Sequence, residues 1–561
     1  MGADLILKNG KVFSVTLDDK VIRGSAVAVS DGIITKIGTD EEVLSLADNN
    51  CKIIDCGGNT ILPGLSDVHC HPSIAASAAD ACNLFGIYKA DDESPEDVIE
   101  KYKKILSDYV KANPDKKIIR GTGWVLGNFS GTGIMPKRQD IDEVCPDIPV
   151  VLESFCQHNL WVNTKAIEAA GVDENTPDVK AGKIYREENG YPAGVFNDPE
   201  AMAYIKEGVP GYELSVDEYK KALEWYQKEC AAKYGVTLVQ DCMHSDSARE
   251  AYRQLAEEHK LIMRARGVYL IEPDKYESQF EKAVERKGKD NCSEDFRIDT
   301  IKIFAEGMFS LLEPYEDEYC RASGIPEGSA TDLYWSDEVM TKYSKKAMDA
   351  GFDVHIHAMG DASVKQCADC LSEAQEEERD NRNVIAHLML VPDETSEKMG
   401  KSRIIGNVQM RWMVYDGDIY AMHPIMGEER SGKAYPMRKM LDDGVILSAG
   451  TDFPVTPPPN VMHEIQCALT RKVFPDVNDY DKYKGRRLGD EKPVTLEEVI
   501  KALTINSAYQ VRAEEYTGSI EEGKSADLVI LDRDLENTPV DEIYSIEVEK
   551  TIFKGEVVYD K

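Results

Sequence analysis

The chain of 561 residues lacks several features that would each define a class of protein. It has no apolar run close to the ~18–20 residues that a membrane-spanning helix needs. It is also poor in positive charge, because 66 Lys and Arg stand against 102 Asp and Glu, which gives a formal net charge of −36. Such an acidic surface repels phosphate backbones and anionic lipids. The composition therefore argues against nucleic-acid and membrane partners.

Secretion signals and zinc-finger cysteine pairs are missing as well. The 13 cysteines are scattered without paired Cys-x-x-Cys motifs, and the first residues carry no basic segment followed by an apolar one. Unpaired thiols are typical of a reducing compartment, so we expect a cytoplasmic protein. An apolar content of 42% is ordinary for a globular chain and is too high for a disordered one.

Both ends of the chain have the alternation typical of β-strands. Near the N-terminus, Asn9-Gly10 between apolar stretches predicts a hairpin, and Asp31-Gly32 predicts a second one. Near the C-terminus, Lys554-Gly555 separates two further strand-like runs. We therefore expect residues 1–62 and 513–561 to form one β-sandwich from the two ends of the chain.

The middle of the chain, residues 63–512, alternates short apolar runs with amphipathic stretches. This alternation is typical of parallel βαβ units in an α/β sheet or barrel. Two stretches, around 75–145 and 160–215, hold too few strands for their length, and we expect them to be inserts. The predicted strands are at 60–62, 148–152, 236–239, 300–304, 353–357, 384–387, 404–408 and 445–449.

Histidine is scarce, with ten in the chain, and two of them form a His-x-His motif. His69 and His71 stand at the end of a predicted strand, where alternate residues share a face. Both imidazoles can therefore converge on one metal ion, although a His-x-His motif alone is also common without a metal.

Three further residues at strand ends extend this pattern. His357 and His387 each close an apolar run, and Asp452 follows the run at 445–449. His355 shares a strand face with His357, so either one could be a ligand; we favour His357, which is nearer the carboxyl end of its strand, where barrel sites lie. Imidazole and carboxylate donors suit zinc, with Mn, Fe or Co as alternatives. The competing interpretation is a set of hydrogen-bonded core histidines and a helix-capping aspartate.

Lys302 is unusual because it lies inside an apolar strand, Ile301-Lys302-Ile303-Phe304. A buried ammonium group is costly unless it is paired or chemically changed. One interpretation is a salt-bridged or solvent-facing lysine. The other is a carbamylated lysine whose new carboxylate bridges two metal ions.

The order of these motifs resembles the amidohydrolase superfamily, and in particular its amidohydrolase-3 group of deformylase-like metal-dependent hydrolases. The resemblance covers essentially the whole chain. It rests on PGLSDVHCH at 63–71, IKIFAEG at 301–307, HAMGD at 357–361, AHLMLVPD at 386–393, AYPMR at 434–438, GTDFPV at 450–455 and GSIEEGKSADLV at 518–529.

The resemblance implies a (β/α)₈ TIM-like barrel at 63–512 that carries the inserts, together with the β-sandwich of the two termini. One or two divalent ions would then activate water as hydroxide at the barrel mouth and cleave a non-peptide C–N bond of a small amide, N-formyl or cyclic amide substrate. A homodimer is also expected. The implied ligands are His69, His71 and Asp452 for one ion and His357 and His387 for the other, with carbamylated Lys302 as the bridge.

Two catalytic roles follow from the same resemblance. Asp452 would act as the general base and then return the proton to the leaving group. His158, in the segment CQHNLWVN at 156–163, is expected to bind the substrate carbonyl or the leaving group, with a structural hydrogen-bonded histidine as the alternative.

The chain also departs from the group pattern at several positions. Glu306 replaces a common Asp, Ala386 replaces a Glu, and NVQMRW at 407–412 replaces a stretch that carries a polar pocket residue. Two other functions therefore stay open. One is a mononuclear aromatic deaminase that uses His69, His71, a later histidine and Asp452 without Lys302. The other is a non-catalytic scaffold protein.

Overall fold

The computed structural model describes residues 2–561 except 91, 130–131, 157, 180–181, 274, 292, 308, 324–325, 331–332, 377–378, 457 and 478–479. The chain divides into two compact units. The first unit comprises residues 1–72, 224–244 and 252–561, and the second comprises residues 73–223 and 245–251. Among the described residues, none of the helices combines the length and apolar character that crossing a membrane requires.

An eight-stranded parallel sheet forms the centre of the first unit, as far as the described residues show. Its strand order is β21-β20-β19-β18-β17-β16-β15-β8, so neighbours in the sheet follow one another in the chain. Most of its residues are buried, as expected for parallel strands covered by helices. The strands are β8 (Leu65–Cys70), β15 (Val236–Asp241), β16 (Arg264–Leu270), β17 (Phe296–Phe304), β18 (Asp353–Ala358), β19 (Val384–His387), β20 (Ile405–Val408) and β21 (Leu447–Ala449).

The two edge strands of this sheet meet at their carboxyl ends. The backbone N–H of Asp452 donates to the carbonyl of His69 over 2.8 Å, and the N–H of His71 donates to the carbonyl of Phe453 over 2.8 Å. These bonds close the sheet into a near-barrel.

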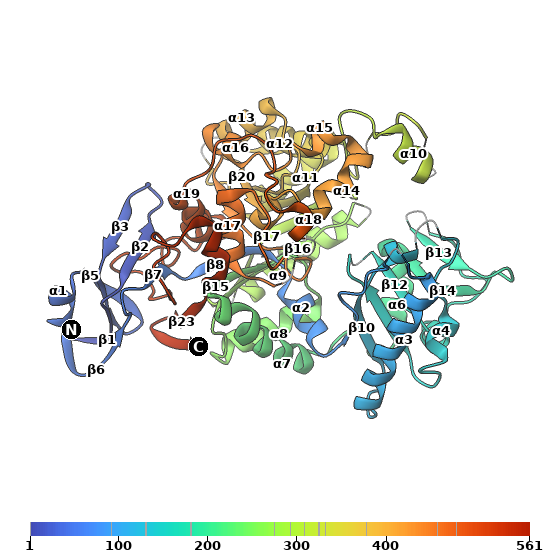
Figure 1. Cartoon of the computed structure of the whole chain (residues 1–561), viewed down its shortest axis with the longest axis horizontal. Helices are drawn as coiled ribbons and strands as arrows, with labels where there is room; N and C mark the ends of the chain where they lie inside the picture. The colour runs from blue at the N-terminus through green and yellow to red at the C-terminus, as the bar shows by residue number, and fades with distance from the viewer. Residues whose placement is uncertain are drawn as a thin grey trace. The chain divides into compact units, whose positions relative to one another are not determined.

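Helices follow the strands in the alternation that the sequence predicts (Figure 1). They are α8 (Asp246–Glu257) after β15, α9 (Tyr276–Asp290) after β16, α11 (Asp337–Asp349) after β17, α12 (Asp361–Ala374) after β18, α13 (Asp393–Lys401) after β19, α14 (Gly417–Met426) and α16 (Met437–Asp442) after β20, and α17 (Val461–Thr470), α19 (Leu496–Lys501) and α20 (Ser507–Gln510) after β21. The expected α/β TIM-like barrel with additional β-structure is confirmed.

The first unit also has two smaller sheets, one made of N-terminal strands alone and one that combines strands from both ends of the chain. One has the order β5-β4-β1-β6, and the other has the order β24-β23-β22-β7-β2-β3. Their side chains share one apolar core that includes Leu7, Val29, Leu528 and Ile552. The strands are β1 (Ala3–Lys8), β2 (Lys11–Val15), β3 (Val21–Gly24), β4 (Ala26–Ser30), β5 (Ile33–Gly38), β6 (Ala47–Asp55), β7 (Thr60–Pro63), β22 (Leu528–Leu531), β23 (Val548–Phe553) and β24 (Glu556–Asp560).

The hairpin expected at Asn9-Gly10 is wrong. The strands on its two sides, β1 and β2, belong to different sheets, so the chain crosses between the sheets at this point. The close approach of the two sheets explains the glycine, because a Cβ on Gly10 would lie 2.4 Å from Cδ1 of Ile61. The turns at Asp31-Gly32 and Lys554-Gly555 do connect antiparallel strands, and all four residues have the positive φ that tight hairpin turns require.

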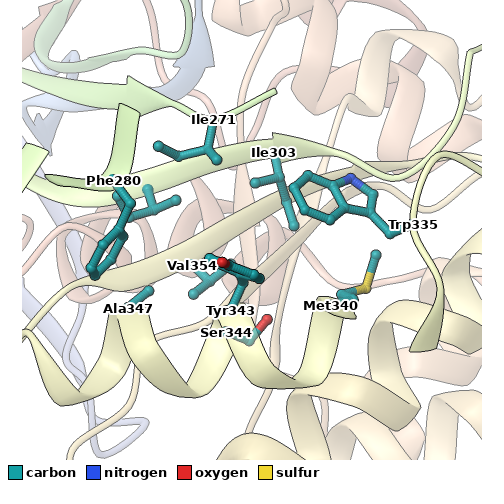
Figure 2. A pocket seen from close by; sticks show the side chains of 10 residues that line it. Ile271, Phe280, Ile303, Trp335, Met340, Tyr343, Ser344, Ala347 and Val354 are labelled. Atoms are coloured by element: carbon teal, nitrogen blue, oxygen red, sulfur yellow. The ribbon is translucent and has the colours of Figure 1, made fainter. Parts of the chain in front are cut away.

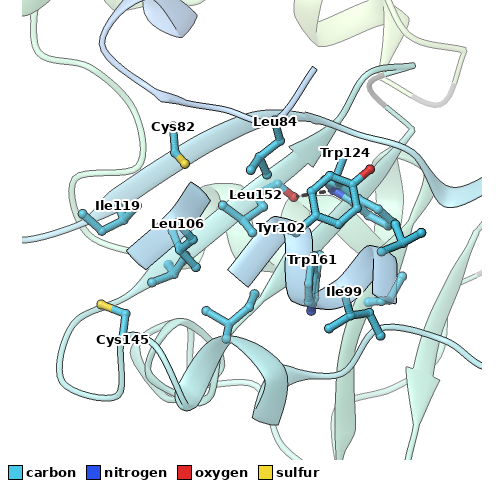
Figure 3. Packing of buried hydrophobic residues seen from close by; sticks show 14 of the residues in the cluster. Cys82, Leu84, Ile99, Tyr102, Leu106, Ile119, Trp124, Cys145, Leu152 and Trp161 are labelled. Atoms are coloured by element: carbon cyan, nitrogen blue, oxygen red, sulfur yellow. Dashed lines mark hydrogen bonds between the residues drawn. The ribbon is translucent and has the colours of Figure 1, made fainter. Parts of the chain in front are cut away.

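The second unit is built on a six-stranded sheet of order β13-β14-β12-β11-β10-β9. On one face α3 packs over a core in which Tyr102, Trp124 and Trp161 meet edge to face, and the Trp124 indole donates to the Leu152 carbonyl over 3.0 Å (Figure 3). The other core contains residues of α5 and α6. The elements are β9 (Cys82–Asn83), α3 (Pro95–Ala112), β10 (Ile119–Trp124), α4 (Arg138–Asp142), β11 (Val150–Ser154), β12 (Asn159–Val162), α5 (Thr164–Ala169), β13 (Lys183–Arg186), β14 (Pro192–Asn197) and α6 (Asp198–Gly208).

Candidate metal centre

The predicted ligands of the first unit gather at the carboxyl end of the parallel sheet. His69 and Lys302 lie near the ends of β8 and β17, and His357 and His387 lie at the ends of β18 and β19. Asp452 comes three residues after β21. Because the strands are parallel, these ends share one edge, and the strand register pairs Phe304 with His357 and Ala358 with His387.

Three of these side chains converge tightly. Nε2 of His71 lies 3.0 Å from Oδ1 of Asp452, and Nε2 of His69 lies 3.5 Å from the same oxygen. The donor atoms of His69, His71 and Asp452 all lie within 4.8 Å of one another, and all three side chains are buried. Nδ1 of His71 is buried without a hydrogen-bond partner among the described residues. Two imidazoles and a carboxylate in this arrangement fit a divalent metal ion.

The closure of the barrel explains this convergence. Asp67, two residues before His69, accepts hydrogen bonds from the N–H of Thr451 over 2.8 Å and from its hydroxyl over 2.6 Å. Gly450 makes the close approach possible, because a Cβ there would lie 2.5 Å from Cβ of His69 and 2.7 Å from its backbone nitrogen. The segments that carry His69 and Asp452 are therefore fixed to each other.

Asp452 is in a position that favours its ionised form. Its backbone has φ +58°, in the left-handed region that a non-glycine residue seldom adopts. Burial favours the neutral carboxyl, but the hydrogen bond from His71 and the positive charges around it outweigh burial and lower the pKa of Asp452 below its ordinary value. The side chain therefore stays a carboxylate at neutral pH.

Lys302 is fully buried, which rules out the solvent-facing interpretation. Its Nζ has no hydrogen-bond partner in the part of the chain that the structure describes, and its pKa is lowered by burial. The neighbouring charges of Cys242 and Asp452 only partly oppose this effect. This fully buried amine, whose Nζ lies 5.2 Å from the ring centroid of Phe304, lacks the hydrogen bonds that buried polar groups usually make, so a purely structural role does not explain it.

His357 and His387 face each other, with ring centroids 4.4 Å apart. His387 also lies 4.6 Å from the ring of His69 and stacks on the indole of Trp412 at 5.5 Å. Trp412 is in the stretch where the sequence departs from the pattern of its group, so an aromatic ring packs against His387 at this point. Burial, assisted by nearby positive charge, holds the pKa of His387 well below its ordinary value.

A second set of converging donors includes a residue that the sequence analysis missed. Cys242 lies with His69 and His355 within the same 4.8 Å limit. His355 also hydrogen-bonds to His69, with 2.8 Å between Nε2 and Nδ1. Cys242 directly follows β15, so its place at a strand end was the signal that could have identified it.

Glu306 fixes the backbone that follows His357. Its carboxylate accepts hydrogen bonds from the N–H groups of Met359 (2.5 Å) and Gly360 (3.0 Å), from the hydroxyl of Ser363 (2.6 Å) and from the N–H of Ser310. Glu306 comes two residues after the end of β17, and Gly360 and Ser363 lie at the amino end of α12. These hydrogen bonds therefore join the end of β17 to the start of α12. The replacement of the common Asp therefore keeps a carboxylate at this junction.

His158 belongs to the second unit, whereas the metal-ligand cluster belongs to the first. Its ring is half-exposed, and Nδ1 lies 3.0 Å from Oδ1 of Asp198. The role predicted for His158 stays a prediction.

A small apolar cavity of the first unit lies outside the cluster (Figure 2). It is lined by residues of β17 and β18, such as Ile301, Ile303 and Val354, and by α11 residues such as Met340 and Tyr343. Ile301 and Ile303 flank Lys302, so by alternation along the strand they point away from it. None of the predicted metal ligands lines this cavity, which we interpret as a packing defect between sheet and helices.

A comparison with protein families shows to which family this chain belongs. The model of the amidohydrolase family matches residues 52–559. The chain belongs to the amidohydrolase family. The expected family and the expectation of an enzyme are therefore confirmed.

Individual amidohydrolases are distant from this chain in sequence. It is 25% identical to the putative amidohydrolase YtcJ of Bacillus subtilis over 98% of both chains. It is also 25% identical to the N-substituted formamide deformylase of Arthrobacter pascens over 100% of this chain and 98% of the relative. The solved structure of an uncharacterized metal-dependent hydrolase from Pyrococcus horikoshii has a TM-score of 0.73 at 21% identity, covering 94% of this chain and 97% of the other. That likeness shows the shared fold.

Proposed function

We propose that this amidohydrolase cleaves a non-peptide C–N bond of a small molecule, in an amide, an N-formyl group or a cyclic amide. The observation that carries the proposal is the convergence of His69, His71 and Asp452 beside the buried, unpaired Nζ of Lys302. The similarity to a formamide deformylase along the whole chain supports this choice of substrate class. The acidic chain, with a net charge of −36, is consistent with a small-molecule substrate instead of a polyanionic partner.

The proposed centre holds two divalent ions, most simply zinc. His69, His71 and Asp452 would hold the first ion, and His357 and His387 would hold the second. Manganese, iron and cobalt use the same nitrogen and oxygen donors. When bound, the ions supply Lewis acidity, which lowers the pKa of a water molecule and polarises the scissile carbonyl.

Lys302 is proposed to bridge the two ions as a carbamate. Burial lowers the pKa of its amine and so favours the neutral form, which is the form that can attack carbon dioxide. A new N–C bond forms and one proton leaves, so that Nζ then carries a carboxylate. This change removes the cost of a buried ammonium group and adds two oxygen donors.

Asp452 is the proposed general base. Its carboxylate is ionised at neutral pH and can take the proton from the attacking water, then deliver it to the departing nitrogen. Nε2 of His71, 3.0 Å from Oδ1, orients the carboxylate for this transfer. We further propose that His158 binds the substrate carbonyl or leaving group.

The variant Lys302→Ala tests the bridging role. We expect it to bind at most one tightly held ion per chain and to lose hydrolytic activity by at least about 100-fold, measured by elemental analysis and amide hydrolysis. Lys346→Ala, which changes a partly exposed lysine of α11 that pairs with Glu277, is the matched control and should keep both properties. Unchanged metal content and full activity in Lys302→Ala would remove the bridging role.

A one-ion deaminase is the second candidate function. The group His69, His71 and Asp452 is geometrically complete without Lys302, and this observation favours it. Wild-type protein with one ion per chain that releases ammonia from heteroaromatic amines would support deamination. Two ions and carboxylate release from amides would support the first proposal.

We also propose a cytoplasmic location. The described cysteines are free thiols, and most of them are buried. Free thiols in such number are usual in a reducing compartment. The homodimer stays a prediction.

A further inference from the structure

A chain of buried side-chain amides in the first unit links two histidines of the candidate metal centre, His355 and His387. Gln240, Gln510, Asn407 and Gln409 are each at most 2% exposed. Consecutive members are joined by hydrogen bonds of 2.9, 3.1 and 3.0 Å. One end of this amide relay contacts His355, and the other end contacts His387.

A single backbone carbonyl fixes the direction of every bond in the amide relay. Nε2 of Gln510 lies 2.9 Å from the carbonyl oxygen of Val68, which can only accept. The amide nitrogen of Gln510 is therefore on this side, and its second hydrogen donates to Oε1 of Gln240. The oxygen of Gln510 is on the other side, where it accepts from Nδ2 of Asn407.

The first arm of the relay runs to His69. Oε1 of Gln240 is 3.2 Å from Nδ1 of His355, so Nδ1 must carry the hydrogen. A second hydrogen, on Nε2, would make this ring a fully buried cation whose hydrogen-bond partners among the described residues are an amide oxygen and another imidazole, which is costly. Nε2 therefore accepts the Nδ1–H of His69 over 2.8 Å. His69 is left with a lone pair on Nε2, the atom that faces Asp452.

The second arm ends in the same way. Nε2 of Gln409 donates to Oδ1 of Asn407, which leaves Oε1 of Gln409 as an acceptor 2.8 Å from Nδ1 of His387. His387 therefore carries its hydrogen on Nδ1. Its lone pair is on Nε2, the nitrogen away from the relay.

We propose that the amide relay sets the tautomers of His69 and His387, so that Nε2 of each ring is the metal-binding atom, and that Gln240, Gln510 and Gln409 are positioning residues. The ligand role of these rings rests on the proposed function. Both nitrogens of His355 are used in the relay, so His355 supports His69 and does not bind the metal. His357 is then the ligand from β18. Such outer partners of metal-bound histidines typically change metal affinity 10–100-fold.

The tautomers can be read directly by ¹⁵N NMR of the full chain with labelled histidine, after a chelator has removed any metal. We expect protonated Nδ1 and unprotonated Nε2 in His69, His355 and His387. A spectrum with protonated Nε2 in His69 or His387 would overturn the relay. This outcome needs no variant, so it decides the inference even where a substitution prevents folding.

Variants that break one arm of the relay test whether each arm controls the tautomer of its own histidine. Gln409→Leu should mix the tautomers of His387 alone and weaken one of two cobalt(II) binding steps 10–100-fold. Gln240→Leu should change His355 and His69 instead. Gln409→Glu in its protonated form keeps an acceptor for His387 and a donor for Asn407, and is expected to restore the wild-type signature.

Gln466→Met is the matched control, since Gln466 is also buried and bonded to a backbone N–H, over 2.7 Å, but lies outside the relay. It should leave every tautomer and both cobalt affinities unchanged. Equal effects of Gln409→Leu on both arms, or none on His387, would overturn the inference. If the wild-type chain shows the predicted tautomers but binds no cobalt, the proposed function is wrong and the amide relay still holds.

Discussion

Buried titratable side chains away from the metal centre already shape how the protein responds to pH. Glu464 in α17 is 3% exposed and accepts a hydrogen bond from the N–H of Arg411 over 2.8 Å. Burial raises its pKa to about 8, so its carboxyl is neutral at pH 7. In the unfolded chain the same group ionises near its ordinary value. At pH values between these two pKa values, folding is therefore accompanied by the uptake of a proton.

Glu464→Gln should remove this pH dependence. Between about pH 4.5 and 8 the folded wild type holds one more proton than the unfolded chain, so its stability falls as pH rises through this window. Relative to wild type, the variant should gain roughly 2–4 kcal/mol in free energy of unfolding from pH 5 to pH 8. Denaturant unfolding at both pH values measures the difference. A difference between variant and wild type that does not change with pH would show that Glu464 is ionised in the fold.

At the scale of elements, the seam between β8 and the segment after β21 positions the candidate ligands His69, His71 and Asp452. Asp67 and Thr451 tie the two segments together, and Gly450 lets them approach. The geometry of this candidate site therefore depends on the closure of the barrel as well as on the three side chains themselves.

Gly450→Ala should damage this seam. The added methyl group would lie 2.5–2.7 Å from Cβ, N and O of His69, so the strand end must move. We expect a loss of about 1–3 kcal/mol in stability and a weaker first metal-binding step, measured by unfolding and cobalt titration. Gly417→Ala is the control, because its methyl group would meet nothing closer than 3.9 Å. Unchanged cobalt affinity in Gly450→Ala would contradict the role of the seam.

The sequence predicted the elements unevenly, and the reasons are physical. Strands with His or Lys at their ends, such as β17 and β18, were found because their apolar pattern is strong. The predicted strands at 60–62 and 148–152 exist, but they belong to other sheets, since local pattern does not specify the partner. β16 was missed because it carries Arg264 and Arg266, whose buried guanidinium groups hydrogen-bond to Asp527 and Tyr516.

The candidate metal centre also has some residues that the sequence predicted and others that it did not. His69, His71 and Asp452 were predictable because strand alternation and parallel topology place them at one edge. The amides that orient the rings were not, because Gln240 and Gln510 are 270 positions apart and meet only in the folded barrel. Sequence spacing carries no signal for such a contact.

At the scale of the whole molecule, metal binding should contribute directly to stability. Ions that bind the folded chain alone stabilise it by mass action, by about 2.7 kcal/mol per site at a free metal concentration of 100 times Kd. Removal of metal by a chelator should therefore lower Tm, and added zinc should restore it. Calorimetry at several zinc concentrations measures this effect. A Tm independent of zinc would argue for the scaffold alternative.

The central claim is that this amidohydrolase uses its metal centre to hydrolyse C–N bonds of small amides. The most direct measurement is carboxylate release from a panel of N-formyl, N-acyl and cyclic amides by zinc-loaded protein, with metal-stripped protein and Asp452→Asn in parallel. The account predicts turnover of at least one class, lost on stripping, restored by zinc and reduced by at least about 10³-fold in the variant. Hydrolysis that persists without metal or in Asp452→Asn, or ammonia release from heteroaromatic amines alone, would contradict it.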